Sequence, residues 1–317
     1  MILIMKEIRH IICGIFYCRD FVEISGSGSF QTSCRFDKDS ASKSATKTYC
    51  CPLACIERTT KEHMITILTF FLLITSVIVN GQEIKTSSFI EEIKKYDISD
   101  LWTLDQFQIE NDTITVDRPE PLGYIGENFQ RFQIHFISAI KNPENELQYF
   151  IYGKTKVKEN ICTFQGTITI SEARTYDEGD IPPLKQGFVK GQYEFFEDPD
   201  QKGTGILKGN FQTDFYINEK GEIKYDALMF VADGFKNNQF EGTWTSYKTG
   251  NAKKCNWGDY RIPDSRELDI GTCEFIPWDK YEEYGWQNYI LAWGQYPDKP
   301  EVIEAMKKEK EKWWLEK

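Results

Sequence analysis

Two carboxylates at alternate positions, Glu267 and Asp269, are the residues whose spacing first suggests chemistry. Side chains two residues apart on a strand share a face, and glycoside hydrolases act through a pair of carboxyl groups. The next alternate position is Gly271, so the motif lacks a third carboxyl group that could protonate a leaving group. A carbohydrate-active enzyme that uses Glu267 and Asp269 needs an acid from another strand, and we keep it as an alternative.

Histidine chemistry has one candidate after residue 81, His135. In RFQIHFISAI it alternates with Phe132, Ile134 and Phe136, so it faces away from the large aromatic side chains of that strand. A single histidine excludes His-rich metal sites and leaves no complete Ser-His-Asp or Cys-His arrangement. We therefore expect no metal and no cofactor. Whether the protein is an enzyme stays open, and the residues favour a protein without catalytic activity.

The stretch MITILTFFLLITSVIVNGQE resembles the start of an exported protein. Met64 to Val79 are 16 residues without charge, a run shorter than a membrane-spanning helix needs. They predict a signal peptide over residues 64–81, cleaved before Gln82, and a secreted or periplasmic protein. The alternative is an uncleaved anchor through residues 64–79.

Residues 1–63 contain six of the nine cysteines and low-complexity stretches such as SGSGSFQTS. They show no sustained apolar period, and in front of a signal peptide their cysteines would lie in a reducing compartment. We interpret this segment as a doubtful extension, either disordered or upstream of a true start at Met64.

Residues 82–317 form a segment of 236 residues, enough for a single domain. Of the 38 basic and 49 acidic residues of the chain, nine and seven lie before residue 82, which leaves a net charge of −13. An acidic surface repels nucleic acid and anionic lipid, so we expect neither as a partner. This part contains no second apolar run that could span a membrane.

Strand-like segments separated by turn signals fill most of this domain. Such short links predict antiparallel hairpins that form a meander. The expected strands are residues 111–117, 131–140, 147–157, 162–173, 188–197, 205–217, 222–232 and 239–248.

A glycine between two large apolar residues recurs in four of these strands, at Gly166, Gly191, Gly209 and Gly242. Such a glycine lets a strand coil sharply. The pattern predicts a mainly β fold whose meander closes into a barrel, with a β-sandwich as the alternative.

Residues 111–248 loosely resemble lipocalin-like, calycin-type barrels, and the chain as a whole resembles uncharacterised exported bacterial β-proteins. The resemblance implies an apolar cavity for one ligand. The Gly-x-Trp that lipocalins carry near the first strand is missing here, and Gly242-Thr243-Trp244 falls on the last expected strand instead.

Short helices are expected on both sides of the strands, near residues 87–97, 278–294 and 300–317. Residues 249–279 are rich in Gly, Pro, Asp and Asn and predict a long ordered loop. Its residues Trp257, Asp259, Tyr260 and Arg261 are the expected recognition surface, because loops on rigid sheets often carry function.

Cys255 and Cys273 bracket this loop with 17 residues between them. In an oxidising compartment a disulfide there would stabilise the fold by about 3 kcal/mol. We predict this disulfide, with Cys162 as an odd buried thiol; three reduced cysteines are the alternative.

These residues together favour an exported, non-enzymatic binding module for a small apolar ligand or a glycan. The ligand is expected in a barrel cavity or on the 255–273 loop. A structural or envelope-interaction protein is the remaining alternative.

Overall fold

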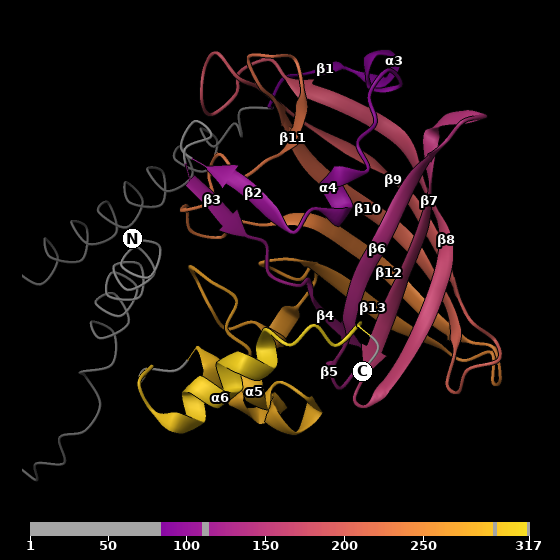
Figure 1. The fold of residues 1–317 in the computed structure, drawn as a ribbon, viewed down its shortest axis with the longest axis vertical. Helices are drawn as coiled ribbons and strands as arrows, with labels where there is room; N and C mark the ends of the chain where they lie inside the picture. Colours follow the sequence, from indigo (N-terminus) through magenta and orange to yellow (C-terminus); the bar gives the residue numbers. More distant parts are fainter. Residues whose placement is uncertain (1–83, 110–113, 294–296, 316–317) are drawn as a thin grey trace, which may run out of the picture. The chain divides into compact units, whose positions relative to one another are not determined.

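A computed structural model describes residues 84–109, 114–293 and 297–315. They form a mainly β fold in which one long antiparallel sheet curls into an open half-barrel (Figure 1). The predicted signal peptide and the extension before it lie outside the described residues, so both stay predictions. No helix in the described part of the chain is long and apolar enough to cross a membrane.

The main sheet runs in the order β5-β4-β13-β12-β10-β9-β8-β7-β6, and neighbouring strands along this order pair antiparallel. Two short strands extend it: β1 pairs with the end of β8, and β11 pairs with β10. The strands are β1 (Thr86–Ser88), β4 (Leu122–Ile125), β5 (Gln130–Arg131), β6 (Gln133–Asn142), β7 (Asn145–Val157), β8 (Asn160–Tyr176), β9 (Lys185–Glu197), β10 (Gly205–Ile217), β11 (Ile223–Tyr225), β12 (Asn237–Ser246) and β13 (Ala252–Asp259).

The predicted meander is confirmed from β6 to β10, where consecutive long strands are antiparallel neighbours joined by short links. β12 also lies beside β10, but the chain reaches it through β11 and a run of turns. The strand predicted over residues 222–232 is too long, because only β11 is extended and turns follow it. The predicted loop over residues 249–279 is wrong at its start, where β13 pairs with both β12 and β4. The polar composition of β13 concealed this strand, since its Asn256 and Asp259 are buried polar residues.

The recurring glycines lie where neighbouring strands approach closely. Gly209 and Gly242 are direct partners across β10 and β12. A Cβ atom on Gly209 would come within 2.6 Å of the Gly242 Cα, a distance that real Cβ atoms do not adopt. The glycines therefore permit the curl that the sequence predicted. The closed barrel is not confirmed, since the described strands form an open half-barrel.

The inside of the half-barrel is filled by aromatic side chains and by the N-terminal elements. These elements are α3 (Ile90–Ile93), α4 (Asp100–Thr103), β2 (Gln106–Ile109) and β3 (Ile114–Asp117). Figure 1 shows α4 and the β2–β3 pair lying against the inside of the curled sheet. Trp102 of α4 is 1 % exposed and packs edge-on against Tyr149 and Phe211. The N-terminal segment thus supplies part of the core.

The outer face of β4 and β13 is covered by the C-terminal region. Its elements are η1 (Arg266–Leu268), η2 (Asp279–Tyr284), α5 (Gln287–Ala292) and α6 (Pro300–Glu309). A second core forms there, made of Leu122, Tyr124, Phe129, Ile262, Leu268, Phe275, Tyr281 and Trp286. The predicted break at Gly285, which has φ 94°, is confirmed. Helical segments lie where they were expected, but the first part is a 3-10 helix and α6 ends at Glu309, well before residue 317. Several C-terminal aromatic residues therefore pack in a core.

Candidate functional site

Trp257, predicted as part of an exposed loop, lies on β13 and is 0 % exposed. Its ring stacks on Phe240 with centroids 5.0 Å apart and an interplanar angle of 11°. It also contacts Tyr193 edge-on and Phe132 at a tilted angle. Trp257 is therefore a core residue of the half-barrel.

Asp259 forms the centre of a buried polar network. Its carboxylate accepts two hydrogen bonds from the Arg118 guanidinium, at 3.0 and 2.9 Å. Tyr225 Oη donates to it at 2.9 Å and Asn238 Nδ2 at 2.8 Å. Burial acts to lower the pKa of Arg118, but Asp259 and Tyr225 outweigh it and raise that pKa above its usual range. The network is fully paired and joins the segment before β4 to β13.

Tyr260 and Arg261 hold neighbouring segments together. The Tyr260 ring packs edge-on against Phe107, Phe230 and Phe235. Arg261 forms an ion pair with Asp269, with Nη1 and Oδ2 2.6 Å apart, and also donates to the carbonyls of Gly271 and Thr272. These contacts order the loop after β13.

The predicted pair of carboxylates does not lie on one strand. Glu267 belongs to η1, while Asp269 forms an isolated bridge with Pro277. Tyr281 Oη donates to Glu267 at 2.7 Å and lowers the pKa of its carboxyl group, and Lys280 adds to this effect. Glu267 and Asp269 therefore do not form the same-face pair on one strand that the enzyme alternative assumed. Asp269 accepts from Arg261 and from the amides of Gly271 and Ile276.

The predicted disulfide between Cys255 and Cys273 is wrong. Cys255 is a free thiol, 0 % exposed on the inner face of β13. Burial raises its pKa well above the usual range, and Glu197 adds to the shift, so this thiol stays protonated. Cys162 is also free and buried, as expected. Neither thiol has the electropositive surroundings of a catalytic cysteine.

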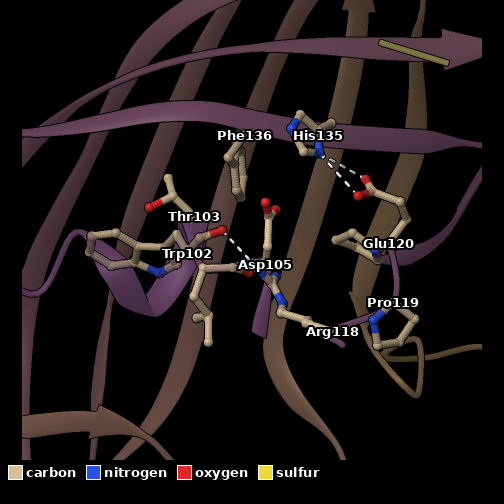
Figure 2. A pocket seen from close by; sticks show the side chains of 10 residues that line it. Trp102, Thr103, Asp105, Arg118, Pro119, Glu120, His135 and Phe136 are labelled. Carbon is tan, nitrogen blue, oxygen red and sulfur yellow. Dashed lines mark hydrogen bonds and ion pairs between the residues drawn. The ribbon is translucent and has the colours of Figure 1, made fainter. Parts of the chain in front are cut away.

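His135 lies beside a small cavity between β6 and the segment before β4. Figure 2 shows its Nδ1 facing the Glu120 carboxylate, 3.0 Å from the nearer oxygen. Arg118 and Trp102 line the same cavity, whose volume is about 20 Å³. That is room for a single water molecule. The imidazole also stacks on Trp314, with ring centroids 3.8 Å apart. His135 thus lies between the C-terminal segment and Glu120.

A larger groove lies on the outer face of the sheet, where β6, β7, β8 and β9 carry no covering element in the described structure. Its volume is about 460 Å³, within the range of small-ligand sites. We call it the outer groove. It is lined by Ser138, Ile140, Phe150, Ile151, Tyr152, Gln165, Gly166, Thr167 and Phe196.

Three aromatic side chains of the outer groove are exposed: Phe150 by 46 %, Tyr152 by 43 % and Phe196 by 42 %. Ile140 beside them is 62 % exposed. The strand register places them in two neighbouring rows. Tyr152 lies opposite Gln165, and Gln165 lies opposite Phe196. In the next row, Phe150 has Ile140 on one side and Thr167 on the other.

The sequence carries a signal for this groove. In an antiparallel strand with one solvated face, apolar and polar residues alternate. Residues 149–152 of β7 read Tyr-Phe-Ile-Tyr, without alternation. Tyr149 and Ile151 are buried in the core, so Phe150 and Tyr152 must point outward. None of the site residues predicted from the sequence lines this groove.

Metal binding has no support in the described residues, which contain no group of three or more His, Cys, Asp or Glu side chains arranged to hold an ion. Comparison of the chain with protein-family models, curated proteins and solved structures finds no match. The candidate site is therefore interpreted from its own geometry.

Proposed function

We propose that this protein is a non-enzymatic binding module that holds a neutral glycan in the outer groove. The observation that carries the proposal is the combination of three exposed aromatic side chains with uncharged polar side chains in one groove of about 460 Å³. Contiguous exposed apolar surface of this kind marks interaction sites.

A pyranose ring matches both features of the lining. One side of the ring presents C–H groups, which carry partial positive charge and pack on the negative face of an aromatic ring. The hydroxyl groups at its rim need donors and acceptors. Gln165 offers both through its amide, and Ser138 and Thr167 offer hydroxyls. All three residues lie at partly or fully solvent-exposed positions of the described sheet, so their polar groups can face a ligand.

The charge of the groove favours a neutral ligand. None of its lining residues is ionisable at neutral pH. The nearest ionic side chains of the adjoining row, Glu194 and Lys208, are 3.1 Å apart and neutralise each other. An anionic lipid or a nucleic acid would require lysine or arginine in the groove.

The other candidate functions have less support. A ligand inside the half-barrel would have to displace side chains such as Phe211, Phe240 and Trp257. An enzyme that uses Glu267 and Asp269 would need to free both from their present partners. A structural or envelope-interaction role needs no groove at all. Secretion or periplasmic location fits glycan binding and rests on the predicted signal peptide alone.

The proposal is tested by screening the full chain against an array of neutral and charged glycans. The variants Phe150→Ala, Tyr152→Ala and Phe196→Ala each remove one ring from the groove. Loss of a stacking ring costs about 0.5–1.5 kcal/mol, so binding should weaken by about twofold to tenfold for a ring in direct contact. Tyr247→Ala is the matched control, since Tyr247 is 42 % exposed and lies outside the groove.

Two results would refute the proposal. The first is that no neutral glycan binds. The second is that glycan binding survives loss of all three groove rings but disappears in Trp278→Ala. Trp278 is 44 % exposed in the C-terminal region, so this result would move the site to the C-terminal aromatic residues.

A further inference from the structure

We infer that the bound glycan is an extended, β-linked chain that crosses the strands, with one sugar ring on Tyr152 and another on Phe196. This inference rests on the proposed glycan-binding function. It adds the direction, the linkage and the minimum length of the ligand.

The direction follows from the strand register. Tyr152 on β7, Gln165 on β8 and Phe196 on β9 form one row perpendicular to the strands. Neighbouring strands lie about 4.8 Å apart, so the two aromatic positions are separated by about 10 Å. A ligand that runs along this row meets an aromatic ring at each end and an amide between them.

The linkage follows from the spacing. In an extended β-linked chain each sugar is turned over relative to the one before, so every second ring presents the same face. One sugar unit advances by about one strand spacing, so two stacked rings about 10 Å apart have one unstacked unit between them. That middle unit lies over Gln165, whose amide can donate to and accept from its hydroxyls.

The shape of the sheet agrees with a straight chain. Figure 1 shows α4 on the concave side of the curled sheet. Phe150 and Tyr152 alternate with the core residues of β7, so the outer groove lies on the opposite, convex side. An α-linked chain coils and needs a concave surface to contact several of its rings. A straight chain on a convex surface touches only a few neighbouring strands, and the row Tyr152–Gln165–Phe196 spans three of them, β7, β8 and β9. The footprint is therefore a trisaccharide.

The alternative direction is along β7, over Phe150 and Tyr152. These two rings are on the same face of one strand, about 7 Å apart. Adjacent sugars of the chain are about one strand spacing apart and every second sugar is about 10 Å away, so a separation of about 7 Å matches neither. Beyond them the strand carries Lys154 on the same face. Phe150 and Ile140, one row away, act as a side wall of the groove.

The experiment is a calorimetric titration of the full chain with β-1,4-linked glucose oligomers, from the disaccharide to the hexasaccharide. The same oligomers with α-1,4 linkage are the matched probes. We expect affinity to rise at least about tenfold from the disaccharide to the trisaccharide and then to level off. The α-linked series should bind at least about tenfold more weakly. Tyr152→Ala and Phe196→Ala should each remove most of the gain at the trisaccharide, and Phe150→Ala should reduce it less.

Three outcomes overturn the inference while the proposed function stands. They are equal binding of the α-linked series, no gain beyond the disaccharide, and a Phe196→Ala variant that binds like wild type while Phe150→Ala does not. The proposed function itself fails if no oligomer binds and no other neutral glycan on an array binds. It also fails if the groove is instead an interface between copies of this chain, shown by a concentration-dependent mass that Phe150→Ala reduces to that of a monomer.

Discussion

Replacing Arg118 by methionine should destabilise the whole fold, because it leaves a buried carboxylate without its ion partner. The side chain of Asp259 is 0 % exposed and that of Arg118 is 7 % exposed. The two residues are 141 positions apart in the chain and are joined by two hydrogen bonds. The pair therefore holds strand β13 against the segment that leads into β4.

The size of the effect follows from what remains around Asp259. Removing one partner of a buried ion pair costs about 3–5 kcal/mol. Tyr225 and Asn238 still donate to the carboxylate in Arg118→Met, which places the effect near the lower limit. The carbonyls of Trp102 and Leu104 also lose the hydrogen bonds that Arg118 Nη1 donates. We expect a loss of about 3–4 kcal/mol in the free energy of unfolding, out of a total of about 5–15 kcal/mol for a domain.

A double-mutant cycle separates the charge from the packing. Asp259→Asn keeps an acceptor for Tyr225 and Asn238 but removes the charge. Combined with Arg118→Met it leaves no buried ion, and replacing both partners of such a pair is often nearly neutral. The double variant should therefore be more stable than Arg118→Met alone, by about 1–2 kcal/mol.

The assay is urea unfolding of the full chain, followed by tryptophan fluorescence, which reports on the buried Trp102 and Trp257. Hydrogen exchange of residues 84–121 shows whether the N-terminal segment loosens first. The reasoning is refuted if Arg118→Met loses less than about 1 kcal/mol, or if the two single effects simply add in the double variant.

Three further changes test other parts of the fold. Burial raises the pKa of Asp214 from 3.8 to about 6, with Asp226 adding to the shift, so stability falls as pH rises from 3.8 and the loss is complete above about 6. Asp214→Asn should raise the free energy of unfolding by about 1–2 kcal/mol near pH 7.5. Below pH 3.8, the pKa of this carboxyl group in the unfolded chain, the substitution should leave the free energy of unfolding unchanged. Urea unfolding near pH 7.5 and below pH 3.8 measures both effects. Gly209→Ala should cost at least about 2 kcal/mol, or prevent folding, because its Cβ meets Gly242; thermal unfolding measures this. Trp314→Ala removes the stack on His135 and should cost about 0.5–1.5 kcal/mol, and increased hydrogen exchange confined to residues 297–315 would show that the C-terminal segment has detached.

The strands of the sheet could be predicted because their apolar residues alternate and turn residues separate them. The expected strand over residues 205–217 coincides with β10, and the glycine pattern correctly indicated strong curvature. Pro300 marked the start of α6, where its missing N–H costs nothing. Each of these signals depends only on residues close together in the chain, so a window of about ten residues is enough to recognise it.

The polar contacts of the interior could not be predicted in the same way. Arg118 and Asp259 each lie in a polar stretch that reads as exposed loop. Their burial depends on a partner that only the fold brings close, and composition carries no sign of that pairing. The same reasoning explains why Trp257, Asp259 and Arg261 looked like a recognition surface: a buried polar network has the composition of a loop.

Stability of the sheet does not explain the aromatic residues of the outer groove. The inner face of β7 already buries Tyr149 and Ile151, and a threonine or glutamine at positions 150 and 152 would satisfy the strand equally well. Exposed apolar strand faces also promote aggregation, which selection generally removes with charged or polar residues. The chain covers the outer face of β4 and β13 with its C-terminal region, whereas the described structure leaves the groove on β6 to β9 open. The stability of the sheet therefore does not account for the exposure of Phe150, Tyr152 and Phe196, and the proposed ligand, packed against their rings, would account for it.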